Sequence, residues 1–136
     1  MPRRCLVLAD SFYEWRKDRK LKTPFRILLK SGELFAFAGI WEENEDSDGH
    51  PIQTFAIIPT DANELVAPIH NRLPVMLQPL EEHAWLAIDK PLGELLSYLR
   101  PYPAAAMRAY QVSTLVNSAA IDQPELIKPE HEPEPS

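Results

Sequence analysis

The pattern of hydrophobic and polar positions predicts a series of short β-strands. Apolar and β-branched runs that are bounded by polar or turn-forming residues are typical of strands. Ser31-Gly32 separates two of these runs, which predicts that residues 25–30 and 34–41 pair as a hairpin. We expect strands at residues 5–9, 12–16, 25–30, 34–41, 54–58, 73–77 and 110–116.

Helical spacing of apolar residues appears later in the chain. We predict helices at residues 80–88 and 92–99, where apolar positions recur every three to four residues. Asp61 is expected to cap a short helix that runs to Leu65 and stops before Pro68.

Together the elements predict an α+β fold, a mainly antiparallel and barrel-like β-sheet with two or three short helices. Residues 17–22 are expected to form a charged turn and residues 42–51 an acidic loop. We expect one domain over residues 1–128 and a disordered tail of proline and glutamate over residues 129–136. A core strand this close to the first residue favours the interpretation that the fold is truncated at its N-terminus.

Composition places the chain among globular proteins. It has 136 residues, 45% of them hydrophobic, and no apolar run that approaches the length of a membrane span. A single cysteine excludes an internal disulfide framework, and the apolar run at residues 5–9 is too short for a secretory signal. We therefore expect a cytoplasmic monomer that makes no contact with membranes.

Charge is distributed unevenly along the chain. Residues 1–30 contain nine Lys/Arg and three Asp/Glu, although the net charge of the whole chain is -6. Such a basic end can bind a polyanion, or it can be a solvated hairpin rich in lysine. Charge alone favours the solvated hairpin.

Glu14 lies between aromatic residues in a predicted strand. Because side chains alternate along a strand, Glu14 shares a face with Phe12, and Tyr13 and Trp15 share the other. A covered face would raise the pKa of Glu14 and suit it to proton transfer. The alternative is a surface carboxylate that pairs with Arg16 or Lys17.

His70 and Arg72 interrupt a second apolar stretch. If this segment is extended, both side chains lie on one face, and an imidazole beside a guanidinium suits an anionic ligand such as phosphate. The alternatives are a structural histidine that bonds a backbone carbonyl and an arginine that pairs with an acid.

Other candidate groups are more easily explained by packing. Trp15 lies near the basic end and could stack on a nucleic-acid base, whereas Trp41 and Trp85 are expected in the core. Cys5 lies in an apolar run and is expected to be an inert core residue. The spacing of His50, His83 and His131 makes no zinc site with His70, so we expect no metal and no cofactor.

Several blocks of sequence resemble the SOS response-associated peptidase (SRAP) family, the abasic-site shielding proteins. They occur in order from Arg3 to about Pro129. The blocks are Arg3-Arg4-Cys5-Leu6, Ala9-Asp10-Ser11-Phe12-Tyr13-Glu14-Trp15, Phe37-Ala38-Gly39-Ile40-Trp41-Glu42, Thr60-Asp61-Ala62-Asn63-Glu64-Leu65, Pro68-Ile69-His70-Asn71-Arg72-Leu73-Pro74-Val75-Met76-Leu77, Val112-Ser113 with Val116-Asn117, and Pro124-Glu125-Leu126-Ile127.

The resemblance implies a reaction with single-stranded DNA. Family members use an N-terminal cysteine, whose amine forms a Schiff base with the aldehyde of an abasic site and whose thiol then closes a thiazolidine ring. By this resemblance, Glu14 shuttles protons and His70 assists Schiff-base chemistry and its reversal. Arg72 holds DNA phosphate, Trp15 lies at the DNA cleft and Arg4 also contacts DNA. The protein would be found at the nucleoid when it is bound to DNA in the DNA-damage response.

The chain also departs from the family pattern. It begins Met1-Pro2, and Cys5 belongs to an internal block and is not the nucleophile. Pro59 replaces a usual threonine, and Ser11 stands where glycine is common. The resemblance therefore implies the C-terminal two-thirds of the family fold, with two catalytic groups and without the nucleophile. Removal of Met1 would expose the amine of Pro2, which could form only a labile iminium because it has no thiol.

Three function classes follow from these observations. The first is an enzyme-like DNA crosslinker that needs its missing N-terminal part, and the second is a module that binds single-stranded DNA without chemistry. The third is an inert β domain that binds a protein partner. The peptidase name would refer to processing of the protein's own N-terminus, because no protease triad is visible.

Overall fold

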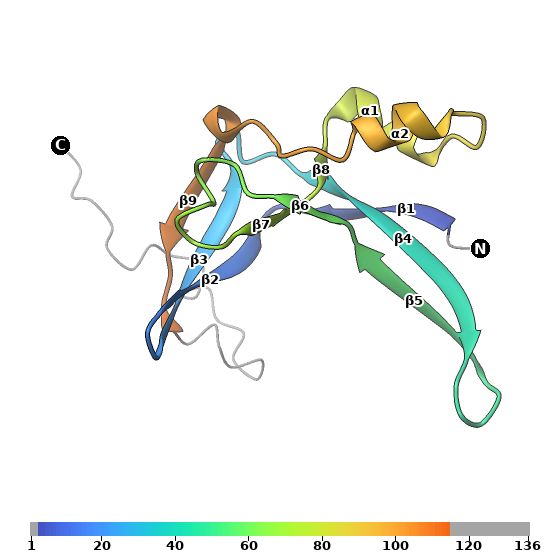
Figure 1. The fold of residues 1–136 in the computed structure, drawn as a ribbon, viewed down its shortest axis with the longest axis horizontal. Coiled ribbons are helices and arrows are strands. Elements are labelled where there is room, and N and C mark those ends of the chain that lie inside the picture. Colours follow the sequence, from blue (N-terminus) through green and yellow to red (C-terminus); the bar gives the residue numbers. More distant parts are fainter. Residues whose placement is uncertain (1–2, 115–136) are drawn as a thin grey trace. The chain divides into compact units, whose positions relative to one another are not determined.

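The computed structural model describes residues 3–114, and these form short strands with a few short helices (Figure 1). Contacts divide them into two compact units. Unit 1 comprises residues 3–9, 34–61 and 72–102, and unit 2 comprises residues 10–33, 62–71 and 103–114. The mainly antiparallel α+β fold that the sequence predicts is confirmed.

Unit 1 contains two antiparallel sheets and both α-helices. In the larger sheet β4 is central, with β1 on one side and β5 and β8 on the other, and β6 pairs with β7 in a separate ladder. The elements are β1 (Arg3–Ala9), β4 (Phe35–Glu45), β5 (Pro51–Ile57), β6 (Pro59–Asp61), β7 (Arg72–Pro74), β8 (Met76–Leu77), α1 (Pro79–Leu86) and α2 (Leu92–Ser97).

One face of the larger sheet packs against the helices and forms the core of unit 1. Trp85 of α1 is 4% exposed and packs with Ala38, Val75, Leu77 and Leu95. Its indole N–H donates to the carbonyl oxygens of β1 and β4, at 3.1 Å and 3.3 Å. Burial of a ring of this size is a major source of stability in a small unit.

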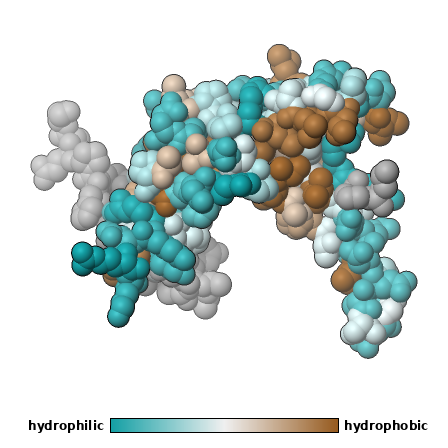
Figure 2. All heavy atoms as spheres, in the orientation of Figure 1, coloured by the Kyte–Doolittle hydropathy of each residue, from teal (hydrophilic) through white to brown (hydrophobic). Residues whose placement is uncertain are grey.

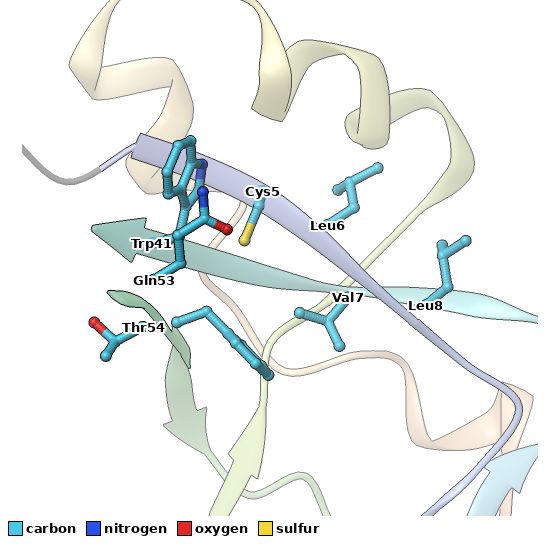
Figure 3. A pocket seen from close by; sticks show the side chains of 8 residues that line it. Cys5, Leu6, Val7, Leu8, Trp41, Gln53 and Thr54 are labelled. Atoms are coloured by element: carbon cyan, nitrogen blue, oxygen red, sulfur yellow. The ribbon is translucent and has the colours of Figure 1, made fainter. Parts of the chain in front are cut away.

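The opposite face of this sheet is an open apolar groove. Cys5, Val7, Trp41 and Phe55 line it, while Leu6 and Leu8 point to the other side of β1 (Figure 3). In the space-filling view, apolar side chains gather over β1 and beside the helices (Figure 2). Cys5 is only half-buried, so its predicted place in the core is wrong, because the strand that carries it has an open face.

Unit 2 is built on a three-stranded sheet with β3 in the centre. The strands are β2 (Phe12–Asp18), β3 (Leu21–Leu29) and β9 (Met107–Gln111), in the order β2-β3-β9, and the 3-10 turn η1 (Ala104–Ala106) precedes β9. Ile27, Val66, Met107 and Val112 are fully buried and form its core. Arg19 adopts a positive φ of 58° at the turn between β2 and β3.

The predicted hairpin of residues 25–30 with 34–41 is wrong, although both strands exist. β3 pairs with β2 and β9, whereas β4 pairs with β1, β5 and β8. The turn at Gly32, where φ is 74°, joins strands of two different sheets. The two-residue turn at Arg19-Lys20 places β2 on one edge of β3, and β9 occupies the other edge, so no edge remains for β4.

Several predicted boundaries shift because strands continue through charged residues. The expected charged turn at 17–22 shrinks to Arg19-Lys20, and the expected acidic loop at 42–51 shrinks to the segment between Glu45 and Pro51. Exposed strand ends tolerate charged side chains because one face meets water.

The predicted helix from Asp61 to Leu65 is absent. Asp61 ends β6, and residues 64–69 form successive turns instead. The strand at 73–77 is present as β7 and β8, with a break at Val75. The expected strand at 110–116 begins earlier as β9 and ends at Gln111, and residues 115–116 lie outside the described part of the chain.

Both helices predicted from apolar spacing are confirmed as α1 and α2. Gln78 and Glu81 form a capping box at the start of α1, where the backbone N–H of Gln78 donates to a Glu81 oxygen at 2.9 Å. No helix between residues 3 and 114 is long and apolar enough to cross a membrane. The expected tail at 129–136 lies outside the described residues.

Candidate functional site

Glu14 lies in the middle of β2, opposite Phe25 of β3. Its carboxyl is half-buried, and burial raises its pKa above the ordinary glutamate value. Tyr13 and Trp15 lie on the other face of β2, with ring centroids 6.5 Å apart. The alternation expected from the sequence therefore holds, and Glu14 has the covered environment that a proton-transfer group requires.

The simple alternative for Glu14, an ion pair with a neighbouring base, is not observed. Among residues 3–114 its carboxylate forms no ion pair with Arg16 or Lys17. The Arg16 guanidinium lies instead over the ring of Phe25, with 5.2 Å between its central carbon and the ring centroid. Glu14 is thus held half-buried without a neutralising partner on its own strand.

The segment that carries His70 is fixed by Asn63, a buried polar residue that sequence reasoning missed. Its side-chain oxygen accepts hydrogen bonds from the backbone N–H groups of Leu65 and Val66, at 3.1 Å and 3.0 Å. The backbone N–H of His70 in turn donates to the carbonyl of Val66 at 2.9 Å. An asparagine that opens a turn is the signal that could have identified it, instead of Asp61.

Glu14 and His70 both belong to unit 2, and they interact electrostatically. The charge of His70 lowers the pKa of Glu14 and partly opposes the effect of burial. His70 itself is exposed. A half-buried carboxyl close to a solvent-exposed imidazole can donate a proton to one atom of a ligand while the imidazole exchanges protons with water.

Arg72 is described in unit 1, so the structure does not test its predicted grouping with His70. It opens β7 and lies opposite Asp61 in the register, and its side chain is exposed. Trp15 is half-buried on β2. The DNA contacts predicted for both residues stay predictions.

Arg4 has an evident packing role. Its Nε donates to the carbonyl of Trp85 at 2.6 Å and its Nη2 to the carbonyl of Ala87 at 2.7 Å. These carbonyls lie at the end of α1, where cations are favoured. Arg4 thus connects β1 to α1 by hydrogen bonds. Its predicted contact with DNA stays a prediction.

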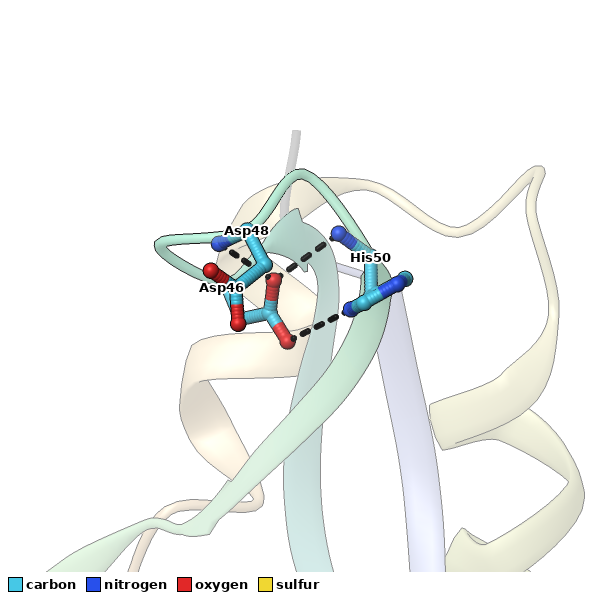
Figure 4. A group of neighbouring side chains, drawn as sticks. All are labelled: Asp46, Asp48 and His50. Carbon is cyan, nitrogen blue, oxygen red and sulfur yellow. Dashed lines mark hydrogen bonds and ion pairs between the residues drawn. The ribbon is translucent and has the colours of Figure 1, made fainter.

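Among residues 3–114, one group of side chains has the composition of a cation site. Asp46, Asp48 and His50 lie in the turn between β4 and β5 (Figure 4). Asp46 accepts hydrogen bonds from the backbone N–H groups of Asp48 and His50, at 2.9 Å and 2.8 Å, and its other oxygen lies 3.4 Å from His50 Nδ1. These bonds explain the cluster as a turn stabilised by an aspartate.

Comparisons with known proteins identify relatives of the whole described region. The family model of the SOS response associated peptidase (SRAP) matches residues 1–119. The abasic site processing protein YoqW of Bacillus subtilis is 49% identical over 128 residues, which cover 93% of this chain and 57% of the relative. The abasic site processing protein HMCES of Gallus gallus is 34% identical and is covered to 44% of its length.

The fold has a solved counterpart as well. A crystal structure of a protein from Bacteroides thetaiotaomicron superposes with a TM-score of 0.86 at 30% identity, over 95% of this chain and 57% of that one. The chain thus spans between 44% and 57% of the length of these relatives. On the strength of the family match, and of relatives that share nearly half its residues, the chain belongs to the SOS response-associated peptidase family.

Proposed function

We propose that this chain carries the proton-transfer groups of an abasic-site processing protein and acts on single-stranded DNA. The observation that supports the proposal is the half-buried carboxyl of Glu14, on which the charge of the exposed His70 acts within unit 2. Because burial raises the pKa of Glu14, its carboxyl keeps its proton at higher pH than an exposed glutamate does. The names of the relatives supply the lesion on which these groups would act.

The chemistry needs an acid at a defined step. An amine adds to the aldehyde carbon of the opened abasic sugar, and the resulting hydroxyl leaves as water once a carboxylic acid has protonated it. Glu14 is suited to donate that proton, and His70 to exchange protons with solvent during formation and reversal of the Schiff base. A thiol then adds to the imine carbon and closes the ring, so that aldehyde and aminothiol yield thiazolidine and water.

The nucleophile in this proposal is a cysteine at the N-terminus. The second position of the present sequence holds Pro2 instead. Arg72 would bind the DNA strand through an ion pair with a phosphate, and Trp15 would stack on a base. Arg4 would act mainly through its hydrogen bonds to the end of α1.

A denaturing gel tests the proposal directly. The chain is mixed with single-stranded DNA that bears one abasic site, alone or together with a supplied N-terminal segment that begins Met-Cys-Gly. We expect a heat-stable shifted band only with the segment, and none when its cysteine is replaced by serine. A band from the chain alone would place the nucleophile elsewhere, and no band in either reaction would reject the crosslinking role.

A non-covalent DNA-binding role is the second candidate, and the observation behind it is the excess of basic residues in unit 2. The described residues of unit 2 include eight Lys/Arg and five Asp/Glu, whereas those of unit 1 include five and ten. The polar β2–β3 turn stands out in Figure 2. Non-covalent binding weakens steeply with salt, while a covalent adduct survives denaturation. Binding that salt abolishes completely, without any band on the gel, would select this second role.

A further inference from the structure

The sheet of unit 2 carries a row of polar and aromatic side chains on the face opposite Glu14. The strand register places Tyr13 of β2 beside Arg26 of β3, and Arg26 beside Tyr110 of β9. Cross-strand neighbours lie on the same face of a sheet. Glu14, opposite Phe25, lies on the other face, so this row is distinct from the candidate proton-transfer site.

Arg26 is a half-buried cation in the middle of this row. One of its terminal nitrogens, Nη1, donates to the hydroxyl of Tyr110 at 2.6 Å, and its central carbon lies 5.9 Å from the centroid of that ring. Its Nε is buried and, among residues 3–114, has no hydrogen-bond partner. A neutral hydroxyl and a ring compensate the burial of a guanidinium only in part.

Arg108 brings a second cation to the same ring. Its central carbon lies 5.0 Å from the centroid of Tyr110, so the two guanidinium carbons are less than about 11 Å apart. Neither arginine forms an ion pair with a carboxylate of residues 3–114. The Arg26 charge also reaches Tyr13, where it opposes the rise in pKa that burial causes.

We propose that Arg26, Arg108 and Tyr110 form a binding site for the phosphodiester backbone of a DNA strand. Two like charges on one ring repel each other, and an anion between or beside them would relieve that repulsion. Arginine is suited to this task because its planar fork donates two hydrogen bonds to one phosphate. The choice of DNA as the source of phosphate rests on the proposed function, but the site takes no part in the chemistry of Glu14 and His70.

Equilibrium binding of a fluorescent single-stranded oligonucleotide without an abasic site tests the inference. Because no aldehyde is present, the outcome is independent of crosslinking. We expect Arg108→Gln to weaken binding about tenfold, as loss of a charge-assisted hydrogen bond predicts, and to reduce the salt slope by about 0.7. Arg26→Gln should act similarly, and Tyr110→Phe, which removes only the hydroxyl, should act more weakly.

The matched control is Lys90→Gln, which removes the same charge at an exposed position of unit 1, between α1 and α2. If this variant loses as much affinity as Arg108→Gln, overall charge explains binding and the inference is wrong. Arg108 is exposed, so its variant tests the site even if Arg26→Gln does not fold.

Inorganic phosphate, titrated by calorimetry, distinguishes the two sources of the anion. We expect it to bind weakly and to compete with the oligonucleotide at constant ionic strength. Phosphate binding that Arg26→Gln abolishes while oligonucleotide affinity stays unchanged would indicate a site for a free anion and would overturn the assignment to DNA.

Discussion

Units 1 and 2 use their polar side chains in different ways. In unit 1, Arg4 donates hydrogen bonds to the end of α1, and Arg100 forms an ion pair with Glu81 at 2.7 Å. These charged side chains therefore connect elements of the fold. In unit 2, Glu14 and Arg26 are half-buried without an ion pair among residues 3–114. Partly buried charge without a neutralising partner is costly, and proteins keep it mostly where a ligand or a reaction uses it.

The largest effect is expected for Glu14→Gln in a chain completed with the N-terminal segment. Loss of general acid catalysis should slow adduct formation by about 10²–10⁴-fold, as measured by the rate of band appearance on a denaturing gel. Glu33→Gln, an exposed acid of the same unit, is the control and should leave the rate unchanged. Equal rates in both variants would remove Glu14 from the reaction.

Trp85→Ala tests how much the packing of α1 stabilises unit 1. Removing a ring that is 4% exposed should cost about 3–5 kcal/mol in the free energy of unfolding, measured by urea denaturation. Leu86→Ala on the same helix is the control, because this side chain is 46% exposed and should matter far less. If the two variants were equally stable, the helices would not form the core of unit 1.

Gly39→Ala tests how tightly β1 and β4 approach each other. A β-carbon at this position would lie 2.8 Å from Cys5 Sγ, so the variant should lose about 1–3 kcal/mol of stability. Adding Cys5→Ala should recover most of this loss, since the sulfur is the closest atom. Additive effects of the two substitutions in a double-mutant cycle would contradict the close contact.

The smallest effect concerns the pH dependence of stability. Because burial raises the pKa of Glu14 in the folded chain, the bound proton stabilises the fold below the ordinary glutamate value, and this stability is lost as pH rises through the raised pKa. Above that range, Glu14→Gln should be slightly more stable than the unaltered chain, by about 0.5 kcal/mol or less because the carboxyl is still partly solvated. A stability difference that does not vary between pH 4 and 8 would exclude the linkage.

The pattern of apolar and polar residues was sufficient to predict features that depend only on neighbouring residues. Strand alternation correctly placed Glu14 and Tyr13 on opposite faces, and apolar spacing located both helices. The predicted helix from Asp61 to Leu65 was wrong, because Asp61 pairs with Arg72 in a β-ladder and Asn63 stabilises the turn that follows. Pairing partners are a non-local property, which is why the predicted hairpin at Gly32 was wrong.

Residue type and order were sufficient to identify the family and the α+β class. They also led to the prediction that Glu14 and His70 transfer protons, which stays a prediction. The three-dimensional structure was needed to show that the charge of His70 acts on Glu14 within unit 2. It was also needed to show that Arg4 bonds the end of α1, and that Arg26 and Arg108 both lie near the ring of Tyr110. The physical reason is that burial and electrostatic fields depend on distances in space, and segments far apart in sequence set those distances.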